Sequence, residues 1–600
     1  MSGDLDGAEK AYQTAAASGE STSQTHLGLG LIDLDRDQPD AAVTHFKQAA
    51  AADPGNIEVL TALGIALAQA GHPAKAATVL VETVSRAPSS VEPRLHLARA
   101  FLDLDRSDDA LHVLKESAVA FPGSAEVWRL KGGVERRVNQ NGEAHTSLTQ
   151  ALVLAPKDTA VLNDLGVLCR ALGKYSDAES HYRAALAIDP DASLTHANLG
   201  NVLERLNRLD EAEDSLRRAY ELNPEAPDTA YNLAAVLTKL ERPDEALPLL
   251  ERIVDNNPDR WDTWTNLGVA RMDTGDLDGA EVALRQSLAL RPENPEAHYN
   301  LAWLLLLGGQ HAEGWTELEW RWQLPEFSSL KKSFDCPTWD GEPLGDRTLL
   351  VHAEQGFGDA IQFARFIAEI PKENGTVILD CHPPLARLLK GVLGIDRVIP
   401  TGESLPRFDT HIPLLSLPKL LAYRGERSAQ SSGYLPAQTV TPQTTLPNSS
   451  KRKIGLVWAG APENKIDRRR QVAIENFLPL FEETDADFIG LQVGPRSRDG
   501  EIFPAGRLTY SCDGVVADFC DTAAIVGQLD LVIGVDTATI HLSGALGIPT
   551  WVLLPYMPDY RWGLGTPETA WYDSMRLFRQ PERGNWASVI GDICNALRSW

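Results

Sequence analysis

The fold of the first half of this chain is decided by one stretch, HANLGNVLERLNRLDEAEDSLRRAYELNP (residues 196–224). Its pattern returns every 34 residues, with a small residue in its first half, an alanine in its second half and a proline at its end. The prolines are Pro54, Pro88, Pro122, Pro156, Pro190, Pro224, Pro258 and Pro292. A period of this length suits two helices joined by tight turns. We therefore predict a stack of similar helix pairs.

Each repeated position has a packing reason. The small residue, Gly200 in this stretch, lets a neighbouring helix approach closely, and Ala212 does the same in the second helix. The proline stops the second helix and presets the turn. Apolar residues fill the helical spacing between these positions. The pattern resembles the tetratricopeptide repeat, and the resemblance covers about residues 1–325.

Both ends of the repeat region deviate from the pattern. Residues 3–12 match the second helix of a later repeat, so the chain begins half-way through a unit. Either this half serves as a cap, or the true start lies upstream. At the other end Gly314 replaces the alanine, and we expect the last unit to dock on the following domain. Four tryptophans gather there: Trp303, Trp315, Trp320 and Trp322.

Composition limits the classes of function. A length of 600 residues allows three or four domains. The net charge of −27 argues against a nucleic-acid binder. Six scattered cysteines without a C-x-x-C pair argue against a zinc site and a disulfide framework. No segment reads as a signal peptide, and the apolar run Leu301–Leu307 is too short to span a bilayer, so we expect a cytoplasmic protein.

After Pro325 the period disappears, and short β-rich runs alternate with helical stretches. This alternation predicts parallel, doubly wound sheets, whose ligands bind at the carboxyl ends of the strands. We expect one lobe over 326–435, a linker rich in Ser, Thr, Pro and Gln over 436–452, and a second lobe over 453–600. The expected strands are Thr348–His352, Thr376–Cys381, Arg397–Pro400, Asp409–Pro413, Lys453–Ala459, Asp487–Gln492, Leu529–Val535 and Pro549–Leu554.

Three motifs are expected at a cleft between the lobes, and the first is VHAEQGFGDAIQFARF (351–366). Gly356 and Gly358 make a tight strand-to-helix turn, and Asp359 follows at the start of the helix. Asp359 acts either as a general base on an acceptor hydroxyl or as a helix N-cap, and the residues leave both open. Gln355 and Gly356 are expected to face the acceptor.

The second motif is GLVWAGAPENKIDRRRQVAIENF (455–477), in which a strand ends at an Ala-Gly turn before a basic cluster. In so acidic a chain the cluster indicates a phosphate or carboxylate partner, unless it is an exposed loop with solvated charges. Trp458 and Gln492, near strand ends, are expected to help select the nucleotide base. The basic residues are Lys465, Arg468, Arg469 and Arg470.

The third motif is DLVIGVDTATIHLSGALGIPTWVLLP (530–555). A buried strand delivers Asp536 and Thr537 to a helix N-terminus, where free N–H groups and the helix dipole favour a phosphate. His541 lies one helical turn beyond Thr537, so both point the same way. This placement favours a role in the site over that of an isolated core histidine.

These motifs, in this order, resemble GT-B glycosyltransferases of the heptosyltransferase type, and more closely bacterial tetratricopeptide-repeat proteins with such a C-terminal domain. The resemblance covers about residues 345–600. It implies inverting sugar transfer from a nucleotide sugar without a metal or other cofactor. It also implies that Asp359 is the base and that Asp536, Thr537 and His541 contact the donor phosphates. The donor stays open between UDP-sugars and CMP-linked nonulosonic acids.

An asparagine recurs two positions before the small residue in four repeats: Asn198, Asn232, Asn266 and Asn300. A side-chain amide both donates and accepts, so such a ladder can grip a peptide backbone whatever its sequence. It resembles the ladder of nucleocytoplasmic O-GlcNAc transferases, which also join these repeats to a GT-B domain. The alternative is that asparagine simply belongs to the repeat pattern.

The leading hypothesis is a cytoplasmic protein O-glycosyltransferase whose repeats hold the acceptor. Flagellin is the favoured acceptor, because flagellin glycosyltransferases are the best parallel for this arrangement. Two alternatives stay open. One is a lipopolysaccharide or capsule glycosyltransferase whose repeats recruit other proteins. The other is a scaffold or chaperone with a non-catalytic second half.

Overall fold

The computed structural model describes residues 5–17, 22–425, 433–435, 446, 448–460 and 470–600. Two compact units divide the chain, Met1–Leu240 and Glu241–Trp600. Most of the predicted linker over 436–452 lies outside the described residues.

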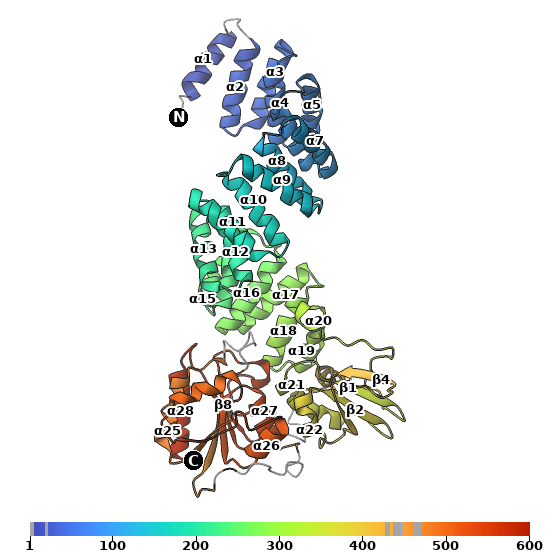
Figure 1. Ribbon diagram of the computed structural model, residues 1–600, viewed down its shortest axis with the longest axis vertical. Helices are drawn as coiled ribbons and strands as arrows, with labels where there is room; N and C mark the ends of the chain where they lie inside the picture. Colours follow the sequence, from blue (N-terminus) through green and yellow to red (C-terminus); the bar gives the residue numbers. More distant parts are fainter. Residues whose placement is uncertain (1–4, 18–21, 426–432, 436–445, 447, 461–469) are drawn as a thin grey trace. The chain divides into compact units, whose positions relative to one another are not determined.

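The first unit consists of helices that pack on their neighbours in sequence (Figure 1). A Cβ on Gly200 would lie 2.5 Å from Cγ of Leu216 in the next helix, so only glycine permits this approach. Ala212 is fully buried. Both packing roles predicted from the period are thus confirmed. The helices are α1 (Leu5–Ala17), α2 (Ser23–Asp35), α3 (Pro39–Ala52), α4 (Ile57–Gln69), α5 (Pro73–Arg86), α6 (Glu92–Asp103), α7 (Ser107–Ala120), α8 (Ala125–Arg137), α9 (Asn141–Leu154), α10 (Thr159–Ala171), α11 (Tyr175–Ile188), α12 (Ser193–Arg205), α13 (Leu209–Leu222) and α14 (Pro227–Lys239).

The second unit begins with the last helical repeats. Trp315, 2% exposed, makes edge contacts with Phe363 and Tyr560 at centroid distances of 6.0 and 5.9 Å. Trp303 also packs on Tyr560, at 5.4 Å. The predicted docking of the tryptophan-rich unit on the following domain is therefore confirmed. The helices are α15 (Pro243–Asn256), α16 (Trp261–Thr274), α17 (Leu277–Leu290), α18 (Pro295–Leu307), α19 (His311–Glu317), η1 (Leu318–Gln323) and α20 (Pro325–Ser328).

Two parallel sheets follow within the same unit. The first has the strand order β3-β2-β1-β4 and the second β10-β9-β8-β5-β6-β7. All eight predicted strands are present, some shorter by one or two residues, and β7 and β10 were not predicted. The strands are β1 (Thr348–His352), β2 (Thr376–Cys381), β3 (Arg397–Pro400), β4 (Thr410–Pro413), β5 (Lys453–Val457), β6 (Asp487–Gly490), β7 (Leu508–Ser511), β8 (Leu531–Val535), β9 (Thr550–Leu554) and β10 (Met575–Arg579).

Short helices connect the strands of both sheets. Those of the first sheet are α21 (Phe357–Phe363), η2 (Ala364–Glu369), η3 (Pro383–Leu385), α22 (Ala386–Leu389), η4 (Leu414–Ser416) and α23 (Leu417–Leu420). Those of the second are η6 (Ile474–Phe477), α25 (Leu480–Glu483), η7 (Pro495–Ile502), α26 (Phe519–Val526), α27 (Ala538–Ala545), η8 (Tyr560–Trp562) and α28 (Trp586–Arg598).

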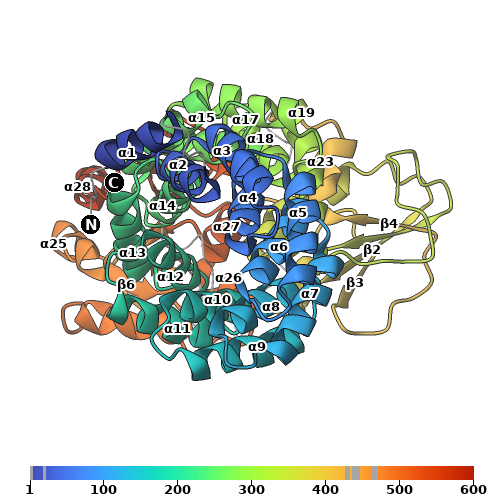
Figure 2. The same ribbon diagram turned by 90° about the horizontal axis from the view of Figure 1, so that it is seen from above.

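Helices α21, α26 and α27 lie between the two sheets (Figure 1), and Figure 2 shows α26 and α27 from above. The core there includes Arg365, whose side chain is fully buried. Its guanidinium lies 4.6, 5.6 and 4.5 Å from the ring centroids of Tyr434, Trp571 and Tyr572. These cation–π contacts join a helix of the first sheet to segments that flank the second, so the two sheets share one packed interior.

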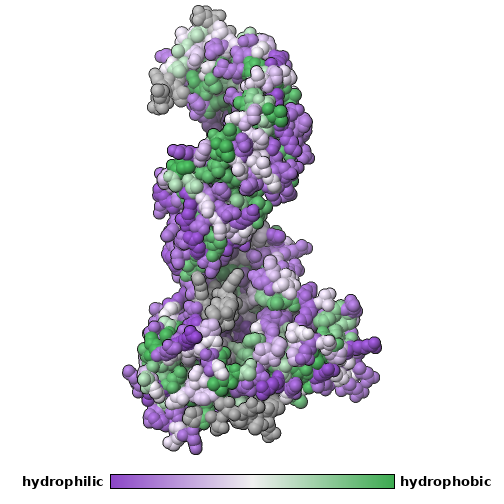
Figure 3. All heavy atoms as spheres, viewed as in Figure 1, coloured by the Kyte–Doolittle hydropathy of each residue, from purple (hydrophilic) through white to green (hydrophobic). Residues whose placement is uncertain are grey.

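The face shown in Figure 3 carries hydrophilic residues interspersed with small hydrophobic patches. Among the helices that the structure describes, none combines the length and the hydropathy that a membrane crossing requires.

Candidate functional site

The turn after β1 is fixed by a buried carboxylate, Glu354. Its oxygens accept the backbone N–H groups of Leu414 at 3.0 Å and Leu415 at 3.2 Å. The Nη2 atom of Arg321 lies 3.3 Å away, and that side chain is fully buried too. Burial raises the pKa of Glu354 to about 7, although the Arg321 charge opposes the rise. Because Arg321 belongs to η1, the contact ties the end of the repeats to this turn.

We expect Glu354 to make stability fall as the pH rises from about 4 to about 7. Its pKa in the folded protein exceeds the value of about 4.3 for an unfolded glutamate. The stabilisation is therefore complete below the unfolded pKa and is lost as the pH rises through the folded one. Urea unfolding should show the stability difference between wild type and Glu354→Gln changing by about 3 kcal/mol over this range. A difference that is constant with pH would contradict the prediction.

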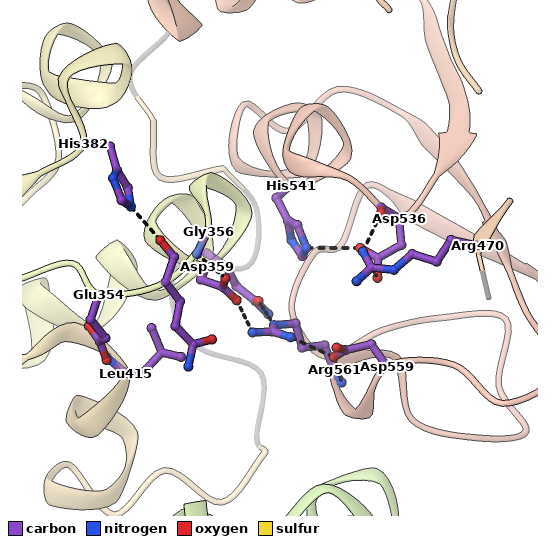
Figure 4. A network of polar contacts seen from close by, with 12 residues as sticks. Glu354, Gly356, Asp359, His382, Leu415, Arg470, Asp536, His541, Asp559 and Arg561 are labelled. Carbon is purple, nitrogen blue, oxygen red and sulfur yellow. Dashed lines mark hydrogen bonds and ion pairs between the residues drawn. The ribbon is translucent and has the colours of Figure 1, made fainter. Parts of the chain in front are cut away.

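Asp359 occupies the third position of α21, and each of its carboxylate oxygens has a partner. Oδ2 accepts the backbone N–H of Gly356, the residue before the helix, at 2.8 Å. Oδ1 forms an ion pair with Arg561 (Figure 4). The capping contact is thus present at the helix start, and the role as a base stays a prediction.

Arg561, in η8, lies at the centre of the charged residues in Figure 4. Its Nη1 contacts Asp559 at 2.8 Å and its Nε donates to Oε1 of Gln362 at 2.7 Å, besides the pair with Asp359. Its side chain is only 9% exposed. Arg561 therefore joins a helix of the first sheet to the segment that follows β9. The three sequence motifs did not include this residue.

Asp536 follows β8 and is 5% exposed. Its Oδ2 lies 3.4 Å from Nη1 of Arg470, and its Oδ1 lies 3.4 Å from Nε2 of His541. Burial works against the charged carboxylate, but Arg470 and His541 outweigh burial and lower the pKa of Asp536. His541 also contacts the Tyr572 hydroxyl at 3.0 Å through Nδ1. The histidine predicted to face a ligand is thus held within a buried polar network.

Thr537 directly precedes α27, as predicted for a phosphate-binding helix start. Its Oγ1 is buried and makes no hydrogen bond to any residue that the structure describes. A buried hydroxyl without a protein partner is costly unless a ligand or water satisfies it. Among the predicted phosphate contacts that the structure describes, Thr537 therefore has a side-chain hydroxyl available for a ligand.

The first and third motifs meet at Gly358. A Cβ there would lie 3.0 Å from Cδ2 of His541 and 3.5 Å from Cα of Ala538. The first turn of α21 thus packs directly on the first turn of α27. The fold therefore brings Asp359 and the Asp536 network into one neighbourhood, although more than 170 residues separate them.

The remaining predicted donor contacts either bond within the second sheet or lie outside the described residues. The indole N–H of Trp458 donates to the Arg496 carbonyl at 3.0 Å, and the ring is 1% exposed. Gln492 accepts the N–H of Ala459 at 3.0 Å and is 8% exposed. Both side chains are thus used within the second sheet. Three residues of the basic motif lie outside the described residues: Lys465, Arg468 and Arg469.

Among the predicted acceptor contacts, Gln355 accepts from Nε2 of His382 through its backbone carbonyl, at 2.6 Å. Asn198 donates from its amide to Oδ1 of Asn163 in the preceding repeat, at 3.0 Å. The four predicted asparagines are all half-buried, two in each compact unit: Asn198 and Asn232, then Asn266 and Asn300. Their role in peptide binding stays a prediction.

The described residues include no group of three or more His, Cys, Asp or Glu side chains placed to hold a metal ion.

Comparisons with known proteins match chiefly the repeats. Residues 1–233 match the model of the C-terminal domain of cilia and flagella-associated protein 70. Residues 203–267 and 271–318 match a tetratricopeptide repeat model. Protein FlbA of Caulobacter vibrioides is 27% identical over 367 residues, which cover 55% of this chain and 60% of FlbA. The match thus spans less than two thirds of that relative.

Among the solved structures that match the chain are proteins described as tetratricopeptide-repeat proteins. The APC/C heterotetramer Cut9–Hcn1 is 19% identical, with 50% of this chain and 59% of that chain covered and a TM-score of 0.39. TTC0263 of Thermus thermophilus is 24% identical, with 30% and 98% covered and a TM-score of 0.28. YrrB, described as having an unusual peptide-binding site, is 24% identical, with 30% and 92% covered and a TM-score of 0.27.

Proposed function

We propose that this tetratricopeptide-repeat protein is a protein O-glycosyltransferase of the GT-B type. It transfers a sugar from a nucleotide sugar to a serine or threonine of a protein that the repeats hold. One observation carries the proposal. Two parallel sheets each present a charged strand-to-helix turn, and the two turns meet where Gly358 packs on α27. A two-substrate reaction between an acceptor and an anionic donor needs such a meeting point.

The proposed roles follow from the chemistry of each group. Asp359 takes the proton of the acceptor hydroxyl as that oxygen attacks the sugar. The N-terminus of α27, with the Thr537 hydroxyl, binds the donor phosphates and stabilises the leaving nucleotide. Arg470 supplies positive charge beside that helix start. The ion pair between Arg561 and Asp359 must open or weaken during turnover, because the carboxylate that acts as the base is the one that Arg561 contacts in this structure.

Flagellin is the proposed acceptor, and intact-mass analysis of flagellin tests acceptor and sugar together. Flagellin from a strain that lacks this chain should be lighter by the mass of the missing sugars. Re-expression of the wild-type chain should restore the mass. An unchanged flagellin mass, together with an altered lipopolysaccharide profile on gels, would favour the alternative of a lipopolysaccharide glycosyltransferase.

A non-catalytic scaffold is the second candidate, because the same charged groups already satisfy one another. Asp359 pairs with Gly356 and Arg561, and Asp536 pairs with Arg470 and His541. Structural ion pairs would account for this arrangement without any reaction. Calorimetry with UDP, ADP and CMP separates the two functions. A glycosyltransferase should bind at least one of these nucleotides, whereas a scaffold should bind none.

A further inference from the structure

Arg579, the last residue of β10, is a half-buried cation that forms no ion pair with any residue that the structure describes. Its Nη2 donates to the carbonyl of Trp562 at 2.7 Å, and its Nε and Nη2 each lie 3.3 Å from the carbonyl of Thr566. Its Nη1 is buried and has no hydrogen-bond partner among the described residues. Burial lowers the pKa of Arg579 to about 10, and no described carboxylate opposes the fall.

Other arginines around the two sheets have the carboxylate partner that Arg579 lacks. Arg321 pairs with Glu354, and Arg561 pairs with Asp359. A cation that is withdrawn from water without a counter-ion destabilises the folded state, because the protein does not replace its hydration. An anion that binds beside the cation removes this penalty. The unpaired charge of Arg579 therefore favours a site for an anionic ligand.

The register of the second sheet places Arg579 level with Asp536. Arg579 pairs with Leu554 of β9. The neighbouring Leu553 pairs with Val535 of β8, and Asp536 follows Val535. Because adjacent strands lie about 4.8 Å apart, roughly 10 Å separates the backbones of Arg579 and Asp536. Both residues thus lie at the carboxyl edge of the sheet, where doubly wound sheets bind their ligands.

Arg579 also faces the side of the sheet that α27 covers. Met575, four residues earlier on β10, approaches Gly544 of α27 so closely that a Cβ on this glycine would collide with it. Residues four apart on a strand point to the same face, so Arg579 points toward this side as well. The helix start that carries the unpaired hydroxyl of Thr537 lies on the same side.

Trp562 links Arg579 to the charged site. Its carbonyl accepts the bond from Arg579, and its ring stacks on the ring of His541 at a centroid distance of 5.3 Å. The indole also lies near the carboxylate of Asp536. An anion held by Arg579 is therefore close to the start of α27.

We propose that Arg579 is a further donor-binding residue, whose guanidinium holds a phosphate group of the nucleotide at the carboxyl edge of the second sheet. The inference rests on the proposed function, since it adds a residue to the donor site of that reaction. Guanidinium N–H groups form charge-assisted hydrogen bonds with phosphate oxygens, and the start of α27 binds the remaining oxygens. Because Arg579 is only half-buried, the nucleotide reaches it from solvent.

Arg579→Gln tests the assignment in the full chain. Glutamine keeps an N–H donor for the carbonyls of Trp562 and Thr566 but has no charge. Since the substitution removes a charge without a counter-ion, the variant without nucleotide should unfold at the wild-type temperature or above it. Arg576→Gln is the matched control, because Arg576 is exposed on the same strand and points to the opposite face of the sheet.

Calorimetry with UDP, ADP and CMP gives the binding readout. The nucleotide that the wild type binds most tightly should bind Arg579→Gln at least about tenfold more weakly, and should bind Arg576→Gln as it binds the wild type. Arg579→Lys should have an intermediate affinity, since lysine keeps the charge but lacks the guanidinium donors.

Wild-type nucleotide affinity in Arg579→Gln would overturn the inference, as would a wild-type protein that binds none of the three nucleotides. A lower unfolding temperature with unchanged affinity would make Arg579 a structural residue and would also count against it. If Arg579→Gln does not fold, Arg579→Lys decides, and wild-type affinity in that variant contradicts the inference. Failure of the proposed function is recognised separately, as an unchanged flagellin mass in the strain without the chain.

Discussion

Replacement of Asp359 by asparagine is expected to lower sugar transfer to flagellin by about 10²–10⁴-fold, the usual contribution of a general base. The asparagine side chain has the same shape and its Oδ1 still accepts the Gly356 N–H, so the turn before α21 should keep its conformation. It cannot take a proton from the acceptor hydroxyl. Nucleotide binding and flagellin binding should therefore survive while transfer, followed by intact mass over time, is lost.

Asp346→Asn provides the control for this prediction. Asp346 is an exposed carboxylate just before β1, outside the charged site, and its replacement should leave transfer unchanged. A wild-type rate of sugar transfer by Asp359→Asn would contradict the proposed role of Asp359 as the general base. The hydrogen bond to Gly356 and the ion pair with Arg561 would then account for this carboxylate.

Replacement of Arg561 by alanine is expected to cost about 3–5 kcal/mol of stability, because breaking a buried ion pair leaves uncompensated charge. The side chains of Asp559 and Asp359 are only 8% and 20% exposed, and both would lose this partner. The bond to Gln362 would be lost as well, and with it a link between the two sheets. Urea unfolding followed by tryptophan fluorescence measures the change.

The exposed pair between Arg598 and Glu483 offers a matched comparison. Arg598→Ala should leave the free energy of unfolding close to that of the wild type, as is usual for a surface ion pair. The loss of stability in Arg561→Lys should lie between the losses in Arg561→Ala and Arg598→Ala. Lysine keeps the positive charge but lacks the several N–H donors of the guanidinium. If Arg561→Ala and Arg598→Ala have the same free energy of unfolding, the ion pairs of Arg561 do not stabilise the fold.

Periodicity predicted the repeats well because each unit contacts mainly its neighbours in sequence. The glycine at 200 and the leucine at 216 belong to one helix pair, so a local pattern records their contact. Continuous apolar runs likewise predicted the central strands, which are buried on both faces. The strands β7 and β10, which form the two edges of the second sheet, were not predicted. Partly buried and exposed residues alternate along β7, so it has no continuous apolar run.

The motifs placed Asp359, Asp536 and Thr537 at strand-to-helix turns, and the structure has them there. Whether such residues face a ligand or one another depends on the direction of their side chains. The spacing of residues in the sequence does not determine that direction. His541 and Asp536 turn toward each other, and Trp458 turns into the second sheet.

The sequence by itself determined the 34-residue helix pairs, the parallel strands and the position of each charged residue at the end of an element. These features depend on short-range periodicity and on turn residues close in the chain. Only the tertiary structure decided that Arg561 pairs with Asp359 across about 200 residues, and that Arg321 at the end of the repeats holds Glu354. Such pairs form when packing removes distant charges from water together, and no local pattern encodes which partner will be near.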